Sequence, residues 1–311
     1  MTTSNGPADD AVRIPLPASF DFAWVLGFLA ARTVASLEHV GDGRYHRSVR
    51  LAGKPVLLEM HEEKAARVGR ERAARTLVVT AQPKLPPNVV LAAVTSMLDL
   101  DVDLARFRKV ASQDPILAAI VRGRSGIRLP QLLDPFEGIT RAILGQQVSV
   151  AGASTMTDRL VRLFERPVRG AAGAGFHAFP TPGDVADAGA DRLREIGLTR
   201  ARAATLAGVA REIATGGLDL ESLRTATPED AQAALQRLPG IGPWTASYVR
   251  MRALGDRDAF PAADLGVIKA MEAAGVQRRA IESVAERWRP WRGYATLHLW
   301  ASLSAGPGTR D

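Results

Sequence analysis

One aspartate stands where an apolar segment passes into a predicted helix. Asp264 follows Phe260-Pro261-Ala262-Ala263 and precedes the helix expected over Leu265–Ala274. An aspartate at that position caps the helix, a role worth ~1 kcal/mol. The helix amides and dipole also favour its ionised form. An ionised carboxylate in a cleft stabilises developing positive charge or activates water. The residues alone leave both interpretations open, helix cap and catalytic carboxylate.

Two glycines lie in a short connection between two predicted helices. The sequence Leu238-Pro239-Gly240-Ile241-Gly242 separates helices expected over Pro228–Arg237 and Pro243–Leu254. Glycine lets the backbone turn sharply and approach another surface closely. The second helix begins with proline, so its free amides and dipole point beyond the hairpin, a geometry that suits a phosphate. Thr245 adds a hydroxyl in the first turn. A simple corner between two helices is the alternative interpretation.

Aromatic residues make up only 5% of the chain, yet five gather around the hairpin and in the C-terminal segment. They are Trp244, Tyr248, Trp291, Tyr294 and Trp300. Trp244 and Tyr248 are four residues apart, which places them on one helix face. Aromatic faces can receive a base that has left the nucleic-acid stack, and they attract a cationic base further. Core packing is the alternative, and we expect it for Trp288 and Trp291.

Composition narrows the classes of protein. The 40 basic residues exceed the 33 acidic ones, which suits a polyanionic partner, although a GC-rich genome also enriches arginine. The chain has no cysteine, which excludes disulfides, thiolate zinc sites, iron–sulfur clusters and cysteine nucleophiles, suicide methyltransferases included. No apolar run reaches the ~20 residues that span a bilayer. We therefore expect a cytoplasmic protein with no membrane partner.

The N-terminal third has a strand-rich pattern. Residues 1–11 are small and polar, and we expect a disordered tail. Short apolar runs separated by glycines then predict an antiparallel sheet with a hairpin at Gly41-Asp42-Gly43. The expected strands are Thr33–Val40, Tyr45–Leu51, Val56–Met60 and Thr76–Thr80. Helices are expected over Val89–Leu100 and Leu104–Ala111. The sequence therefore predicts an α+β domain over residues 12–112.

Residues 113–311 have a helical pattern throughout. Asp134-Pro135-Phe136-Glu137 is typical of a capped helix start, with Glu137 as the partner in a capping box. After Gly145-Gln146-Gln147 a second helix is expected to about Phe164, and Pro167–Pro182 is expected as a loop. A further helix is predicted over Thr199–Thr215.

Three further motifs accompany the hairpin and the aspartate. They are Phe20–Trp24 with Gly27–Arg32, then Arg141–Gln146, then Trp288–Arg292 with Tyr294 and Leu297–Trp300. Together with Leu238–Lys269, they make the chain similar to the helix-hairpin-helix, Gly/Pro-rich, Asp-bearing superfamily of DNA glycosylases. Within it, the chain resembles the bacterial 3-methyladenine DNA glycosylase II family. The resemblance implies an α+β domain like a TATA-binding-protein repeat, followed by two all-α subdomains. These subdomains flank the active-site cleft and include a helix-hairpin-helix at about 228–254.

The resemblance also implies roles for particular residues. Asp264 is the implied catalytic residue, and the pocket for the flipped base is implied to be lined by Phe28, Trp244, Tyr248 and Trp300. The implied DNA contacts are Gln147, at the wedge position that fills the gap left by the base, and Gly240, Ile241, Gly242 and Thr245. Backbone carbonyls of Gln236, Leu238 and Ile241 are the implied ligands of a sodium or potassium ion. No other cofactor is expected.

We therefore expect a monomer that binds damaged double-stranded DNA and cleaves the glycosidic bond of alkylated bases such as 3-methyladenine and 7-methylguanine. Lyase-competent relatives carry a lysine where this chain has Trp244, so no Schiff base and no strand incision are expected. Gln147 replaces an apolar wedge residue, and Leu265 replaces an aromatic one, which leaves the lesion range open. The alternatives are a non-catalytic DNA-damage binder of the same fold and a glycosylase for deaminated or oxidised bases.

Overall fold

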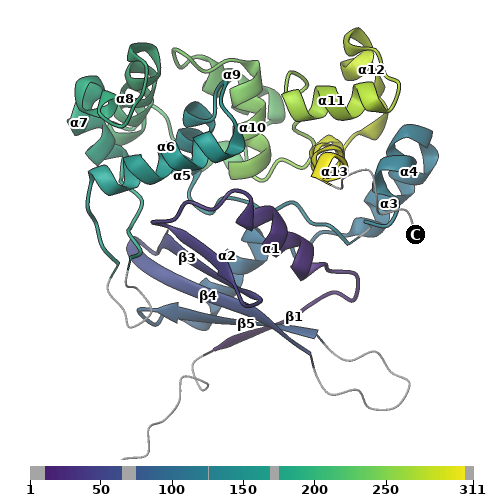
Figure 1. Ribbon diagram of the computed structural model, residues 1–311, viewed down its shortest axis with the longest axis horizontal. Coiled ribbons are helices and arrows are strands. Elements are labelled where there is room, and N and C mark those ends of the chain that lie inside the picture. The colour runs from purple at the N-terminus through teal and green to yellow at the C-terminus, as the bar shows by residue number, and fades with distance from the viewer. Residues whose placement is uncertain (1–10, 65–74, 125, 169–174, 305–311) are drawn as a thin grey trace, which may run out of the picture.

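The computed structural model describes residues 11–64, 75–124, 126–168 and 175–304. The predicted tail at residues 1–11 lies outside these ranges, apart from Ala11. The described chain forms one sheet beneath an arc of helices (Figure 1). None of the helices in these ranges combines the length and the hydropathy that a bilayer-spanning segment requires.

Within the described ranges, the sheet has five antiparallel strands in the order β1-β5-β4-β3-β2. They are β1 (Val12–Pro15), β2 (Glu38–Gly41), β3 (Arg44–Leu51), β4 (Lys54–Lys64) and β5 (Arg75–Gln82). The predicted hairpin is confirmed, and Asp42 and Gly43 both have positive φ (51° and 70°), as a two-residue type I′ turn requires. The strand predicted from Thr33 begins only at Glu38, because the amides of Leu37 and Glu38 both donate to the Val34 carbonyl.

Two helices pack on one face of the sheet, α1 (Phe22–Ala30) and α2 (Pro87–Met97). Asp21 caps α1 by accepting a hydrogen bond from the Trp24 amide at 2.9 Å. Val25 of α1 and Val94 of α2 join the buried core of the sheet domain. Phe28, one turn further along α1, belongs instead to a core of the helical part, so α1 connects the sheet domain to the helices.

One helical unit combines both ends of the helical sequence. It contains α3 (Leu104–Gln113), α4 (Pro115–Val121), α11 (Leu265–Ala273), α12 (Ile281–Ala285) and α13 (Arg292–Ser304). Phe107 of α3 contacts three rings at centroid distances of 6.0 Å (Trp291), 5.3 Å (Tyr294) and 5.3 Å (His298). Trp288 and Trp291 are buried in this core, as predicted.

The second helical unit contains the consecutive helices from α5 to α10. They are α5 (Pro135–Leu144), α6 (Val150–Leu163), α7 (Pro182–Arg194), α8 (Arg200–Ala214), α9 (Pro228–Gln236) and α10 (Pro243–Ala253). The loop predicted over Pro167–Pro182 lies partly outside the described residues. Helix α10 contributes Ala246 and Val249 to this core and Met251 to the other one. It therefore forms the common wall between the two units.

The predicted start of α5 is confirmed, but the predicted capping box is wrong. Asp134 caps α5 by accepting a hydrogen bond from the Phe136 amide at 2.8 Å. Glu137 does not reach back to the cap. It pairs with Arg47 of β3 and with Arg141, at 2.7 Å from the latter. Burial alone would raise the pKa of Glu137, but the two guanidinium groups outweigh it and hold that pKa below its usual range. This buried ion cluster joins the sheet to α5.

Candidate active site

Asp264 is the N-cap of α11 and accepts four hydrogen bonds. Its Oδ1 accepts from the amides of Gly266 (2.9 Å) and Val267 (3.1 Å), which confirms the predicted helix cap. Oδ1 also accepts from Trp300 Nε1 at 2.9 Å, and Oδ2 accepts from Trp244 Nε1 at 3.1 Å. Four N–H donors stabilise the charged form of a carboxylate. The side chain is half-buried, so the carboxylate of Asp264 is held in place and remains within reach of a ligand.

The two indoles come from separate helices that meet at α11. Trp244 lies in the first turn of α10, and Trp300 lies in the last part of α13. Gly266 makes the approach of Trp300 feasible, because a Cβ atom there would stand 2.9 Å from Trp300 Cδ1 and 3.0 Å from Asp264 Oδ1. A side chain at residue 266 would therefore push the indole away from the carboxylate.

Two of the four predicted pocket residues, Trp244 and Trp300, contact this carboxylate, and a third, Tyr248, packs against both of their rings. Trp244 and Tyr248 stack with ring centroids 5.5 Å apart, and Tyr248 lies 6.2 Å from Trp300. The fourth, Phe28, is only 7% exposed and stacks on Trp24 at 5.3 Å. Arg32 lies between Phe28 and the other rings. Its Cζ is 3.8 Å from the Phe28 ring centroid and 5.8 Å from the Trp300 ring centroid.

Two arginines beside these rings were not singled out from the sequence. Burial, together with the charge of Arg252, lowers the pKa of Arg32 to about 10, so Arg32 remains a cation at neutral pH. Arg252 is itself buried, donates from Nε to the Pro130 carbonyl at 2.8 Å, and places Cζ 4.9 Å from the Phe28 centroid. A signal was present, because Arg32 follows Phe28 by four residues and Arg252 follows Tyr248 by four. That spacing is typical of side chains that share one helix face, although Arg32 itself lies just after the end of α1.

The hairpin between α9 and α10 has the predicted backbone. Gly240 has φ 85°, and a Cβ atom there would stand 2.1 Å from Thr205 Oγ1 of α8. Gly242 precedes α10 and gives it no side-chain cap, which leaves the amides of the first turn open to an anion. Gly240 and Gly242 are exposed, whereas Ile241 and Thr245 are buried, and only 2% of the Thr245 surface is accessible. The side chains of those two residues face the protein interior, so their predicted contacts with DNA stay predictions.

The predicted wedge residue lies in the turn between α5 and α6. Gln147 is exposed and has φ 56°, a left-handed conformation that few non-glycine residues adopt. The neighbouring Val148 is exposed as well. Leu265, the residue after Asp264, is also exposed, with 68% of its surface accessible.

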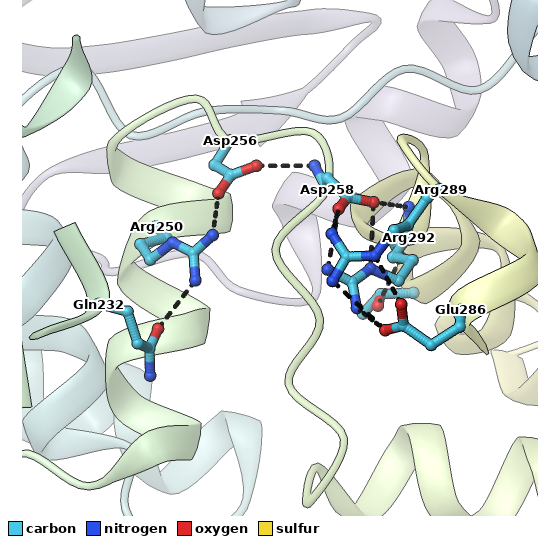
Figure 2. A network of polar contacts seen from close by, with 8 residues as sticks. Gln232, Arg250, Asp256, Asp258, Glu286, Arg289 and Arg292 are labelled. Carbon is cyan, nitrogen blue, oxygen red and sulfur yellow. Dashed lines mark hydrogen bonds and ion pairs between the residues drawn. The ribbon is translucent and has the colours of Figure 1, made fainter. Parts of the chain in front are cut away.

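A polar network holds the connection that leads from α10 to Asp264 (Figure 2). Asp256 pairs with Arg250 and accepts a hydrogen bond from the Asp258 amide at 2.8 Å. Asp258 pairs with Arg289 (2.6 Å), which lies shortly before α13, and with Arg292 (2.8 Å), the first residue of α13. These ion pairs fix the end of α10 to the start of α13. Within the described residues, no cluster of three or more histidine, aspartate and glutamate side chains is placed to hold a metal ion.

The comparisons with known proteins agree with this arrangement. Residues 11–134 match the AlkA N-terminal domain, and residues 140–292 match the HhH-GPD superfamily of base excision DNA repair proteins. A sheet domain followed by this helical core is therefore the fold class, as predicted. DNA-3-methyladenine glycosylase 2 of Escherichia coli K12 is 34% identical over 90% of this chain and 93% of its own length. The chain belongs to the DNA-3-methyladenine glycosylase 2 family.

Two further relatives extend the comparison. A Mycobacterium tuberculosis protein described as a probable bifunctional transcriptional activator/DNA repair enzyme is 37% identical over 94% of this chain. This chain spans 57% of that relative's length. The solved structure of 3-methyladenine DNA-glycosylase from Archaeoglobus fulgidus superposes with a TM-score of 0.78. It is 26% identical, and the match covers 93% of this chain and 97% of that one.

Proposed function

We propose that this chain is a monofunctional DNA glycosylase that hydrolyses the N-glycosidic bond of alkylated bases in double-stranded DNA. The observation that carries the proposal is the carboxylate of Asp264, held by two indole N–H groups and two backbone amides. Family membership supports the same activity. The location that follows for an enzyme of this kind is the bacterial cytoplasm, with the enzyme acting as a monomer on the nucleoid.

The proposed reaction divides its work between the base and the carboxylate. A purine alkylated at N3 or N7 carries a positive charge, so the C1′–N bond breaks with its electron pair leaving on the base. The sugar becomes an oxocarbenium-like cation, which the anionic Asp264 stabilises. Water then bonds to C1′ and gives up a proton to the carboxylate or to solvent. Among the described residues, one donor (Trp244) bonds to Oδ2 and three bond to Oδ1, so Oδ2 has more free lone-pair capacity to assist the reaction.

Trp244 supports the absence of lyase activity. Its indole nitrogen donates to Asp264 and lies at the position where lyase-competent relatives carry a lysine. An indole cannot form the Schiff base that strand cleavage requires. The enzyme is therefore proposed to leave an intact strand with an abasic site.

The hairpin supports binding of the DNA backbone. The open amides at the start of α10 suit a phosphate, and the exposed Gly240 and Gly242 allow the strand to approach closely. A sodium or potassium ion would be held by carbonyls of Gln236, Leu238 and Ile241 and would add positive charge at the same place. The Leu238 carbonyl accepts the Ile241 amide at 3.1 Å and keeps its second lone pair, so the residues fit such a cation.

One observation favours a second class of substrate. Arg32 and Arg252 place two cations beside the aromatic rings. Guanidinium groups repel a cationic base and donate hydrogen bonds to carbonyl oxygens. Neutral deaminated purines, which present such an oxygen, are therefore the second candidate substrate.

Base release from duplex oligonucleotides tests the proposal. Duplexes carrying 7-methylguanine, 3-methyladenine, hypoxanthine or an oxidised guanine are incubated with the protein, then analysed with and without alkali. We expect alkali-dependent strand breaks with the alkylated substrates and none without alkali. Breaks without alkali would contradict the monofunctional assignment. No release from any alkylated duplex, with binding to damaged DNA retained, would support a non-catalytic damage binder instead.

A further inference from the structure

The side chain of Gln146, next to the predicted wedge residue Gln147, connects two loops. One is the turn between α5 and α6, called the wedge turn below, and the other is the hairpin between α9 and α10. The amide nitrogen of Gln146 donates to the Gly240 carbonyl and to Thr245 Oγ1, both at 3.0 Å. The two bonds use both N–H groups of that amide. They cross from the turn between α5 and α6 to the hairpin and to the first turn of α10.

The main chain of Gln146 is also bound by a residue of a third element, helix α8. Arg202 of α8 donates a hydrogen bond to the main-chain carbonyl of Gln146. Helix α8 also receives the hairpin, because Gly240 packs directly against Thr205. The wedge turn, the hairpin and α8 therefore meet at Gln146, one residue before the strained, exposed Gln147.

We propose that Gln146 is a positioning residue that couples the phosphate grip of the hairpin to insertion of the wedge turn into the duplex. The inference rests on the proposed function and assigns it a further residue. When the hairpin seats on the backbone, Gln146 holds the wedge turn at a fixed distance from it. Gln147 and Val148 then enter the helix at the nucleotide to be flipped. Without Gln146 the hairpin still binds DNA, but the wedge turn is free to move relative to it.

The acceptor hydroxyl allows a matched pair of variants. Thr245→Val keeps the shape of the side chain and removes the acceptor, whereas Thr245→Ser keeps the acceptor. Gln146→Ala removes both bonds, and Gln277→Ala, an exposed glutamine after α11, is the control. All are made in the full chain carrying Asp264→Asn, so that flipping is measured without base release. A second set in the wild-type background measures excision.

Three quantities are measured for each variant: the thermal unfolding midpoint, the affinity for undamaged duplex, and flipping. Flipping is followed by the fluorescence of 2-aminopurine placed beside a 7-methylguanine, which rises when the neighbouring base leaves the stack. We expect Gln146→Ala to weaken flipping about 10-fold to 30-fold, the scale of two lost hydrogen bonds. Undamaged-duplex affinity is expected within about 2-fold of the parent. Thr245→Val should show part of the loss and Thr245→Ser a smaller part of it, whereas Gln277→Ala should show little or none.

Two outcomes overturn the inference. The first is flipping by Gln146→Ala at the parent level. The second is a loss of flipping that comes with a lower unfolding midpoint and with a loss of undamaged-duplex affinity of the same fold-change. That result would mark a purely structural role. Failure of the proposed function is distinguishable, because it shows as absence of base release by the wild-type protein while the flipping signal and its dependence on Gln146 remain.

Discussion

Gly266→Ala tests whether the close approach of Trp300 to Asp264 matters for catalysis. The new methyl group would lie 2.9 Å from Trp300 Cδ1, whereas carbon atoms settle at about 3.5–4.0 Å. The indole must therefore retreat by about 0.5–1 Å, which stretches its 2.9 Å hydrogen bond to Oδ1 beyond useful range. A hydrogen bond to a charged group contributes ~1.5–3 kcal/mol. We expect the single-turnover rate of base release to fall about 10-fold to 100-fold.

Stability should change little in the same variant. Alanine in place of glycine in a helix raises the free energy of unfolding by ~0.5–1 kcal/mol. The close contact with Trp300 lowers it by ~1–3 kcal/mol, so the two effects partly cancel. Gly208→Ala in α8 is the control, because a Cβ atom at residue 208 meets nothing within 4 Å. It should gain stability and keep its activity. A rate for Gly266→Ala within about 2-fold of the wild type would refute the reasoning.

Three other predictions concern the site and the buried charges. Trp300→Phe keeps an aromatic face but removes the N–H donor at 2.9 Å, so single-turnover release should fall about 10-fold while damaged-duplex affinity stays nearly constant; equal losses of both would contradict it. Arg47→Met leaves Glu38 and Glu137 with Arg141 alone, so urea unfolding should show a loss of ~3–5 kcal/mol. Arg13→Met, in the exposed pair with Glu63, should leave the unfolding free energy almost unchanged. Burial lowers the pKa of His298 to about 3 in the folded protein, against ~6.5 in the unfolded chain. As the pH falls, the unfolded chain therefore binds a proton at His298 before the folded protein does. The contribution of His298 to stability is complete above about pH 6.5 and is lost as the pH falls towards 3. His298→Phe should flatten that limb of the curve of unfolding free energy against pH, and an unchanged limb would contradict the assignment.

Local signals in the sequence predicted much of the scaffold. Asp42-Gly43 formed the expected hairpin turn, Asp134 capped α5, and Asp264 capped α11. Each feature depends on residues close together in the sequence, where turn and cap chemistry applies directly. The partner of Glu137 could not be predicted in this way. A nearby backbone amide and a distant guanidinium competed for it, and the ion pair with Arg47, far away in the chain, prevailed.

In the candidate site, too, local features could be predicted from the sequence and contacts between distant segments could not. The spacing of Trp244 and Tyr248 placed both rings on one helix face, as observed. The hydrogen bond from Trp300 to Asp264 depends on how α13 packs against α11, which no local pattern contains. The approach of Arg32 to Phe28 had a local signal in the four-residue spacing, but that of Arg252 depends on the packing of α10 against α1. Contacts between helices distant in sequence are therefore what the structure adds.

The most direct test of the central claim is the single-turnover rate at which 7-methylguanine leaves a duplex, compared between the wild type and Asp264→Asn. Asparagine caps a helix as well as aspartate, so α11 keeps its start, while the negative charge and the acceptor for Trp244 Nε1 are lost. We expect release to fall at least about 100-fold, with affinity for the damaged duplex retained. Release by Asp264→Asn at the wild-type rate would show that Asp264 is a helix cap and that the catalytic carboxylate is not this one.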